Sequence, residues 1–296
     1  MIDLHMHTKY SDGSSSLIEL LKIAEEKKLQ YISITDHNTC MAYKELESIE
    51  YKKYYTGKII KGVELNTSVN GINIELLGYG IDTNKMQEKL LEVYPSKEKR
   101  NNIEKNQLIE ICNKLGIELE DSEMKYFDKE KHKYFSTYLL QQIKKNPENK
   151  KYFLSEESWN DAMVFYRKEM CNKDSKFYID NTKLYPTIEE TIKIIKDAKG
   201  LVFVPHVFIY GENSDMIFKE ITEKYKVDGF ECYYSKFTKE QSDFLLDYCK
   251  KNNYYISGGS DFHGKVKPDI EMGTGRGNLN IEEKIIDRWI EKVECI

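Results

Sequence analysis

Short apolar strands alternate with amphipathic helices along most of this chain, and no other feature constrains its fold as strongly. The strand patterns cover residues 31–34, 59–65, 72–77, 201–204, 229–233 and 254–257. An Asn70-Gly71 turn predicts a hairpin between the second and third of these strands. Ser16 and Glu19 form a capping box that predicts the start of a helix. Repeated strand–helix units of this kind predict an α/β fold with a parallel sheet, either open or closed into a barrel.

A further strand at the N-terminus carries two histidines, His5 and His7. Side chains along a strand alternate between its faces, so these two point to one side while Leu4 and Met6 point to the other. Neutral imidazole is a common ligand of zinc and other divalent metals. Taken alone, the pair could equally be two histidines on an exposed strand that bind no metal. Its interpretation therefore depends on the rest of the chain.

Other residues of ligand type stand at strand ends, such as His37 after 31–34 and Glu64 near the end of 59–65. In a barrel the site lies at the C-terminal ends of the strands, which would bring distant residues together. Imidazole and carboxylate ligands without cysteine favour Zn, Mn or Fe. We expect two or three divalent ions, with Glu64 able to bridge a pair. The predicted ligands are His5, His7, Asp12, His37, Glu64, His206, Asp261 and His263.

Composition narrows the class of protein. The chain has 296 residues, of which 40% are hydrophobic and 32% charged, as in soluble globular proteins. A net charge of -5 argues against a general nucleic-acid-binding surface but permits a small charged substrate in a local pocket. The scattered cysteines and the lack of a leader or an apolar run of spanning length predict a cytoplasmic protein with no membrane segment and no disulfide partner.

Residues 86–185 differ in character from the rest of the chain. They are rich in Lys and Glu, mostly helical in period and poor in strand signals. We expect an inserted helical subdomain here, with residues 1–85 and 186–296 forming the metal-binding barrel. One helix is predicted over 101–115 with Gly116 as its stop, and His132 is expected at the surface.

The ligand-type motifs, in their order and spacing, resemble the PHP (polymerase and histidinol phosphatase) family. The resemblance covers residues 1–80 and about 187–275. It implies a distorted (β/α)7 barrel that holds two or three metal ions and, in most members, a phosphoesterase activity. The motifs are His5-Met6-His7-Thr8, Ser11-Asp12-Gly13, Thr35-Asp36-His37-Asn38, Gly62-Val63-Glu64, Val204-Pro205-His206 and Gly259-Ser260-Asp261-Phe262-His263-Gly264.

The resemblance also implies a division of ligands among the ions. One ion would be held by His5, His7, Glu64 and Asp261, and a second by Asp12, His37 and His263. Glu64 and His206 would contribute to a third.

Three further residues receive roles by the same resemblance. Asp36 would serve catalysis by orienting a ligand or a bound water. Arg100, at the head of the insertion, would contact phosphate as in the subfamily that acts on nucleotides. Arg276, in a glycine-rich segment, is a second candidate for binding the substrate; for either arginine a solvated surface position is the alternative.

The chain departs from the family pattern at two places. Glu75 stands where many members have a histidine, and the insertion lacks an Arg-Pro-His sequence near its middle. We predict that Glu75 acts as an oxygen ligand beside Glu64 and His206, in a site that would favour Mn over Zn. The alternative is an empty third site with Glu75 paired to a lysine.

These patterns predict a metal-dependent phosphoesterase acting on a small phosphate ester, with nucleotides or short oligonucleotides preferred. One alternative is a phosphate monoesterase of the histidinol-phosphatase type. Others are a hydrolase of C–N bonds on a similar metal barrel and a non-catalytic metal-binding module that regulates or scaffolds.

Overall fold

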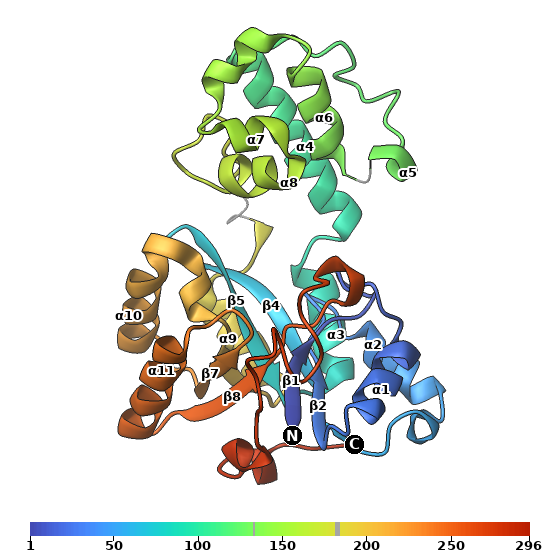
Figure 1. Cartoon of the computed structure of the whole chain (residues 1–296), viewed down its shortest axis with the longest axis vertical. Coiled ribbons are helices and arrows are strands. Elements are labelled where there is room, and N and C mark those ends of the chain that lie inside the picture. The colour runs from blue at the N-terminus through green and yellow to red at the C-terminus, as the bar shows by residue number, and fades with distance from the viewer. Residues whose placement is uncertain (133, 181–183) are drawn as a thin grey trace. The chain divides into compact units, whose positions relative to one another are not determined.

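The computed structural model describes residues 1–132, 134–180 and 184–296. The chain divides into two compact units (Figure 1): unit 1 comprises Met1–Tyr94 and Tyr185–Ile296, and unit 2 comprises Pro95–Leu184. The boundary predicted between residues 85 and 86 falls inside helix α3 (Thr83–Val93), whose buried side chains pack into the core of unit 1. The inserted, mostly helical subdomain over 86–185 stays a prediction.

The first sheet of unit 1 is parallel and has the strand order β1-β2-β3. Its connections run through α1 (Leu17–Glu26) and α2 (Met41–Ser48). Helix α1 begins at the predicted capping box, in which Ser16 Oγ accepts from the Glu19 N–H at 3.3 Å. Its buried apolar face packs into the core of unit 1. The strands are β1 (Ile2–Met6), β2 (Tyr31–Ile34) and β3 (Lys58–Ile59).

The second sheet has the order β4-β5-β6-β7-β8 and is mixed. The predicted hairpin is confirmed, because β4 and β5 pair in antiparallel register across the Asn70-Gly71 turn. Strand β5 is antiparallel to β6, whereas β6, β7 and β8 run parallel. The strands are β4 (Gly62–Val69), β5 (Ile72–Tyr79), β6 (Leu201–Val204), β7 (Gly229–Tyr234) and β8 (Tyr255–Gly259).

Helices cover the second sheet in the alternation that the sequence predicts (Figure 1). Helix α9 (Ile188–Asp197) precedes β6, and α10 (Ser214–Lys224) and α11 (Lys239–Asn252) precede β7 and β8. Capping boxes begin both α9 and α11. The α/β class is therefore confirmed.

Among the described residues, isolated β-bridges link the two sheets, and no continuous hydrogen-bonded pairing of strands joins them. Met6 bridges Phe262 beyond β8, and His37 beyond β2 bridges Glu64 in β4, both in parallel sense. These bridges lie at the ends of the strands that carry the ligand-type residues. The closed (β/α)7 barrel stays a prediction.

Unit 2 is helical and has a hydrophobic core of its own. The helix predicted over 101–115 is confirmed as α4 (Lys97–Lys114), after which Gly116 has a φ of +70°. The surface position predicted for His132 is wrong: its ring packs 4.7 Å from that of Tyr138, and the residue is 5% exposed. The remaining helices are α5 (Lys129–His132), α6 (Phe135–Ile143), α7 (Glu156–Asn160) and α8 (Ala162–Phe165). Within the described residues no helix combines the length and apolarity needed to cross a membrane.

Candidate metal centre

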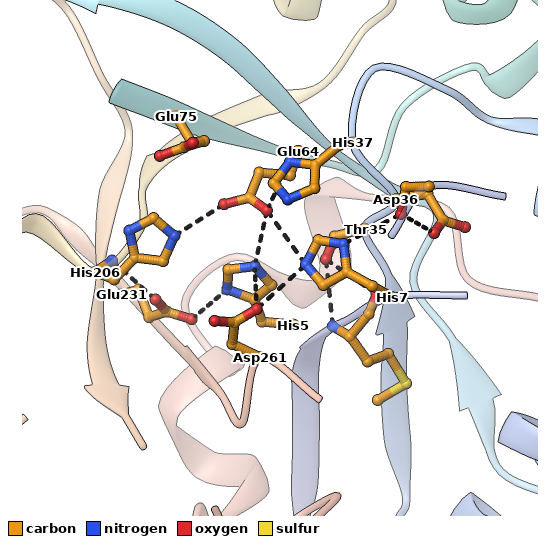
Figure 2. Close-up of polar contacts among 12 residues, drawn as sticks. His5, His7, Thr35, Asp36, His37, Glu64, Glu75, His206, Glu231 and Asp261 are labelled. Carbon is orange, nitrogen blue, oxygen red and sulfur yellow. Dashed lines mark hydrogen bonds and ion pairs between the residues drawn. The ribbon is translucent and has the colours of Figure 1, made fainter. Parts of the chain in front are cut away.

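The predicted ligand residues of unit 1, apart from Glu75, lie in neighbouring groups. Figure 2 shows His5, His7, His37, Glu64, His206 and Asp261 among them. In the described residues, three groups have potential ligand atoms within 4.8 Å of one another. His7 belongs to the first two groups and His5 to the last two. The division of ligands among individual ions stays a prediction. The groups are His7, Asp12, His37 and His263; His5, His7 and Asp261; and His5, Glu64 and His206.

Glu64 lies at the middle of this cluster (Figure 2). Its Oε2 is 3.1 Å from His5 Nε2, 3.2 Å from His7 Nε2 and 3.3 Å from His37 Nδ1. Its other oxygen, Oε1, is 2.9 Å from His206 Nε2. One carboxylate therefore contacts members of all three groups, as a bridging ligand would.

The position of Glu64 in its strand differs from the prediction. The expected strand over 59–65 is two strands, because the chain leaves the first sheet after β3 and enters the second at β4. Glu64 is therefore near the start of β4 rather than near the end of a strand. It still reaches the cluster, because its backbone forms the parallel bridge to His37 just beyond β2.

The backbone turns sharply where the ligands leave their strands. His206 and Asp261 have φ values of +27° and +59°, and Asn38, beside His37, has +54°. Non-glycine residues rarely adopt this region, and such strain concentrates at functional sites. Strand β8 also lies very close to β1, since a Cβ on Gly259 would be 2.4 Å from that of His5. The fold therefore constrains tightly where these side chains point.

Buried nitrogen atoms in the cluster test whether a metal ion fits there. His7 Nε2, His37 Nδ1 and His206 Nδ1 are buried and form no hydrogen bond among the described residues, although the first two lie close to Glu64 Oε2. Buried polar atoms are nearly always satisfied, so each such nitrogen needs an explanation. Imidazole nitrogens gathered around carboxylates form the donor set that Zn, Mn or Fe binds, and the residues therefore fit divalent ions.

The pKa values of the cluster show how the protein balances its charges without metal. Burial lowers the pKa of His7, but contacts with Asp261 and Glu64 and the charge of Asp12 outweigh it and raise that pKa to about 9. Burial raises the pKa of Glu64 and Asp261, yet neighbouring histidines bring both well below the ordinary values, and the charge of Lys267 adds to this effect at Asp261. Protons on the histidines thus stand in for the positive charge of an ion.

This balance gives the metal-free protein an expected pH dependence. A histidine whose pKa is raised on folding stabilises the fold fully below its ordinary pKa, and this contribution is lost as the pH rises through the folded value. For His7 the window runs from about pH 6.5 to about 9. We therefore expect the melting temperature of chelator-treated protein to fall across this window, as measured by calorimetry.

Two comparisons make this test specific. Metal-loaded protein should change less over the same pH range, because metal ions occupy nitrogens that protons otherwise hold. His7→Ala should flatten part of the decline in the chelated protein. A melting temperature that rises between pH 6.5 and 9 without metal would contradict the expectation.

Asp36 organises the loop that carries two of the ligands. Its carboxylate accepts from the Thr8 N–H at 2.8 Å, the Thr8 hydroxyl at 2.6 Å and the Ser11 hydroxyl at 2.5 Å. Thr8 follows His7, and Ser11 precedes Asp12, so Asp36 holds this loop in place. Figure 2 shows Asp36 to one side of the cluster around Glu64. This placement agrees with an orienting role, and the role itself stays a prediction.

Glu231 belongs to the site, although sequence reasoning missed it. It lies in β7 and is fully buried, with Oε1 2.8 Å from His5 Nδ1 and Oε2 accepting from the His206 backbone N–H at 2.9 Å. The contact with Oε1 favours the tautomer in which His5 Nδ1 carries the proton, leaving Nε2 to face Glu64. The sequence signal that could have identified it is the presence of a charged residue, Glu231, within an otherwise apolar strand.

Glu75 belongs to none of the three groups found among the described residues. Its carboxylate accepts from Asn66 Nδ2 at 3.1 Å and from the Tyr210 hydroxyl at 2.8 Å, where the alternative interpretation expected a lysine. Its charge nevertheless acts on His206, whose pKa it helps to raise against the lowering effect of burial. Ligation by Glu75 stays a prediction.

A structure of crystals soaked in Mn²⁺ tests the prediction for Glu75. We expect a carboxylate oxygen of Glu75 within about 2.0–2.3 Å of an ion that Glu64 and His206 also bind. Glu75→Gln, soaked in parallel, should leave that position with weaker density. A Glu75 side chain that keeps its contacts with Asn66 and Tyr210 beside an unfilled position would make the prediction wrong.

Neither of the two predicted substrate-binding arginines is on an element that carries the cluster. Arg276 is exposed on the segment after β8, with Nη2 2.5 Å from Asp269 Oδ2. Arg100 is on α4, in unit 2. Their contacts with phosphate stay predictions.

An α/β unit that gathers buried imidazoles and carboxylates at one place has the donor set of a divalent metal-binding protein. The chain belongs to the PHP domain family, whose model matches residues 3–257. It thus belongs to a family of metal-dependent phosphoesterases, as the sequence resemblance implied.

Known relatives and solved structures agree with this assignment. A 5'-3' exoribonuclease from Haemophilus influenzae is 27% identical over 294 residues, covering 97% of each chain. The DNA polymerase/3'-5' exonuclease PolX from Bacillus subtilis is 30% identical over 82 residues, which are 23% of this chain and 14% of that protein.

Two solved structures share the fold at 18% identity. A predicted metal-dependent phosphoesterase from Bifidobacterium adolescentis has a TM-score of 0.65 and covers 99% of this chain and 96% of its own. An amidohydrolase from Chromobacterium violaceum, with bound sulfate and no metal, has a TM-score of 0.63. The match covers 90% of this chain and 88% of that protein.

Proposed function

We propose that this chain hydrolyses a phosphate ester of a nucleotide or a short oligonucleotide with the help of two or three divalent ions. The observation that carries the proposal is the cluster around Glu64, where one carboxylate contacts four histidines of three ligand groups. Bound divalent ions supply Lewis acidity for a phosphoryl oxygen and lower the pKa of water. We also propose that unit 1 is a closed (β/α)7 barrel and that the protein is cytoplasmic.

Exposure indicates the side from which a substrate would enter. The Asp12 side chain is 51% exposed and that of His37 is 25% exposed, whereas His5 and His7 are fully buried. The substrate would therefore approach from the side of Asp12 and His37, and the deeper residues would hold the ions away from bulk water.

The protein's own residues prepare the ligands for this chemistry. His263 is kept neutral, since burial and the nearby charge of His7 lower its pKa. Its Nδ1 lies 2.9 Å from the Asp261 carbonyl oxygen, to which Nδ1–H donates, so that Nε2 faces Asp12. A neutral imidazole with one nitrogen committed to a carbonyl presents the other as a ligand.

The relative from Haemophilus influenzae supports a nucleotide-containing substrate. It is named as a 5'-3' exoribonuclease and aligns with this chain over nearly the whole of both lengths. Short RNA is therefore the first substrate to test, followed by mononucleotides and histidinol phosphate.

A panel of esters and amides on metal-reconstituted protein separates the proposal from its alternatives. Cleavage of nucleotide or oligonucleotide esters that disappears with chelator supports it. Exclusive cleavage of histidinol phosphate would favour the monoesterase, and cleavage of amides alone would favour a C–N hydrolase. Binding of metal without hydrolysis of any of these substrates would favour a regulatory module.

Arg100 provides a test of substrate charge recognition. If Arg100 pairs with a phosphate, Arg100→Ala should raise KM or lower kcat/KM on a nucleotide by about tenfold or more without removing metal, because charge-assisted bidentate contacts are strong. Steady-state kinetics with metal analysis measures this, and Arg276→Ala allows the second candidate to be compared. Kinetics equal to the parent would place Arg100 among solvated surface residues.

A further inference from the structure

Lys267 places a positive charge beside a predicted metal ligand of unit 1. It lies in the segment that follows β8, six positions after Asp261, and its Nζ is 2.6 Å from Asp261 Oδ2. Its side chain is 26% exposed, so the residue is only partly buried. The predicted motifs end at Gly264 and give this lysine no role.

The two oxygens of Asp261 face different surroundings. Oδ1 is 3.4 Å from His7 Nε2 and 3.3 Å from His263 Nδ1, within the histidine cluster. Oδ2 accepts from the Tyr234 hydroxyl at 2.9 Å and from Lys267. Tyr234 is 2% exposed and already holds Oδ2 from the protein interior. The orientation of Asp261 therefore does not depend on the ammonium alone.

Once divalent ions bind, the carboxylates of the centre are compensated by these ions and no longer fully compensate the positive charge of Lys267. Asp12, Glu64 and Asp261 each bring one negative charge, and buried Glu231 brings another. Two divalent ions would balance these four carboxylates, while the nearby Asp36 and Glu75 accept hydrogen bonds from neutral N–H and O–H groups. A lysine ammonium close to such ions is repelled by them, so its presence favours an additional anion at the mouth of the centre.

We propose that Lys267 is a substrate-contacting residue that binds a phosphate oxygen of the ester at the metal centre. This inference rests on the proposed phosphoesterase function and assigns a charge contact within unit 1. An ammonium has three N–H donors, and the contact with Asp261 uses one of them. The flexible four-carbon stem lets the remaining donors reach a neighbouring oxygen without moving the backbone.

Kinetics and phosphate inhibition of the metal-loaded full chain test this assignment. Lys267→Met keeps the length of the side chain and removes its charge, whereas Lys267→Arg keeps the charge. Lys265→Met is the matched control, since Lys265 is exposed in the same loop. For Lys267→Met we expect KM for the nucleotide and the inhibition constant of inorganic phosphate to rise about 10- to 100-fold.

Further readouts separate contact with the substrate from a purely structural role. Metal content should equal that of the parent in Lys267→Met, Lys267→Arg should recover part of the phosphate affinity, and Lys265→Met should behave as the parent. Unchanged constants in Lys267→Met, or a loss of metal that accounts for its lower activity, would overturn the assignment. If the parent itself neither cleaves phosphate esters nor responds to phosphate, the proposed function fails as well.

Discussion

Replacing His7 with alanine is expected to remove metal from the protein and to lower phosphoesterase activity by at least about 100-fold. His7 belongs to two of the three ligand groups, and its Nε2 lies 3.2 Å from Glu64 Oε2 and 3.4 Å from Asp261 Oδ1. One substitution therefore weakens two candidate ion sites and leaves Asp261 and Glu64 with less positive charge. Elemental analysis of protein purified without chelator, together with steady-state kinetics, measures both effects.

The parent protein, purified in the same way, should carry at least about two equivalents of transition metal. Asp261→Ala should resemble His7→Ala, because both residues belong to the same ligand group. His132→Ala is the matched histidine control, since His132 lies in unit 2 and outside every ligand group of the described residues. A parent protein that contains no metal, and whose melting temperature does not change when metal is added, would refute the metal centre.

Replacing Glu231 with glutamine is expected to lower metal affinity by about 10- to 100-fold, although the change keeps the size of the side chain. The backbone N–H of His206 can only donate, so the amide oxygen must occupy the position of Glu231 Oε2. The amide NH₂ then faces His5 Nδ1 and favours the tautomer in which Nε2 carries the proton. That tautomer has no lone pair on Nε2 to offer a metal ion.

Titration against a metal indicator measures the affinity of Glu231→Gln. Glu240→Gln is the matched control, because Glu240 is exposed on α11. The circular dichroism spectrum and melting temperature of the metal-free variant show whether the fold persists. Parent-like affinity in a folded Glu231→Gln would mean that His5 does not depend on Glu231 for its tautomer.

The features that the sequence predicts correctly are those encoded by neighbouring residues. Short apolar runs placed most of the strands, capping boxes placed the starts of α1, α9 and α11, and the Asn70-Gly71 turn placed the hairpin. Residue chemistry at strand ends selected the histidines and carboxylates that the fold brings together. These signals are local, because periodicity, caps and turns depend on residues a few positions apart.

Contacts between distant segments could not be read in this way. The pairing of His5 with Glu231 spans 226 positions and exists because β7 lies beside β8, which in turn packs against β1. Of the two partners of Glu75, Asn66 lies opposite it in the predicted hairpin, whereas Tyr210 reaches it from a distant segment and could not be predicted.

The chain alone determined the alternation of elements, the chemical type of the candidate site and most of the residues that gather there. Tertiary structure decided that Glu64 stands at the start of a strand, that His132 is buried in unit 2 and that Glu231 sits behind His5. It also placed Lys267 beside Asp261. The physical reason is that burial and the pairing of charges depend on which strands and loops become neighbours, and sheet order sets this across the whole chain.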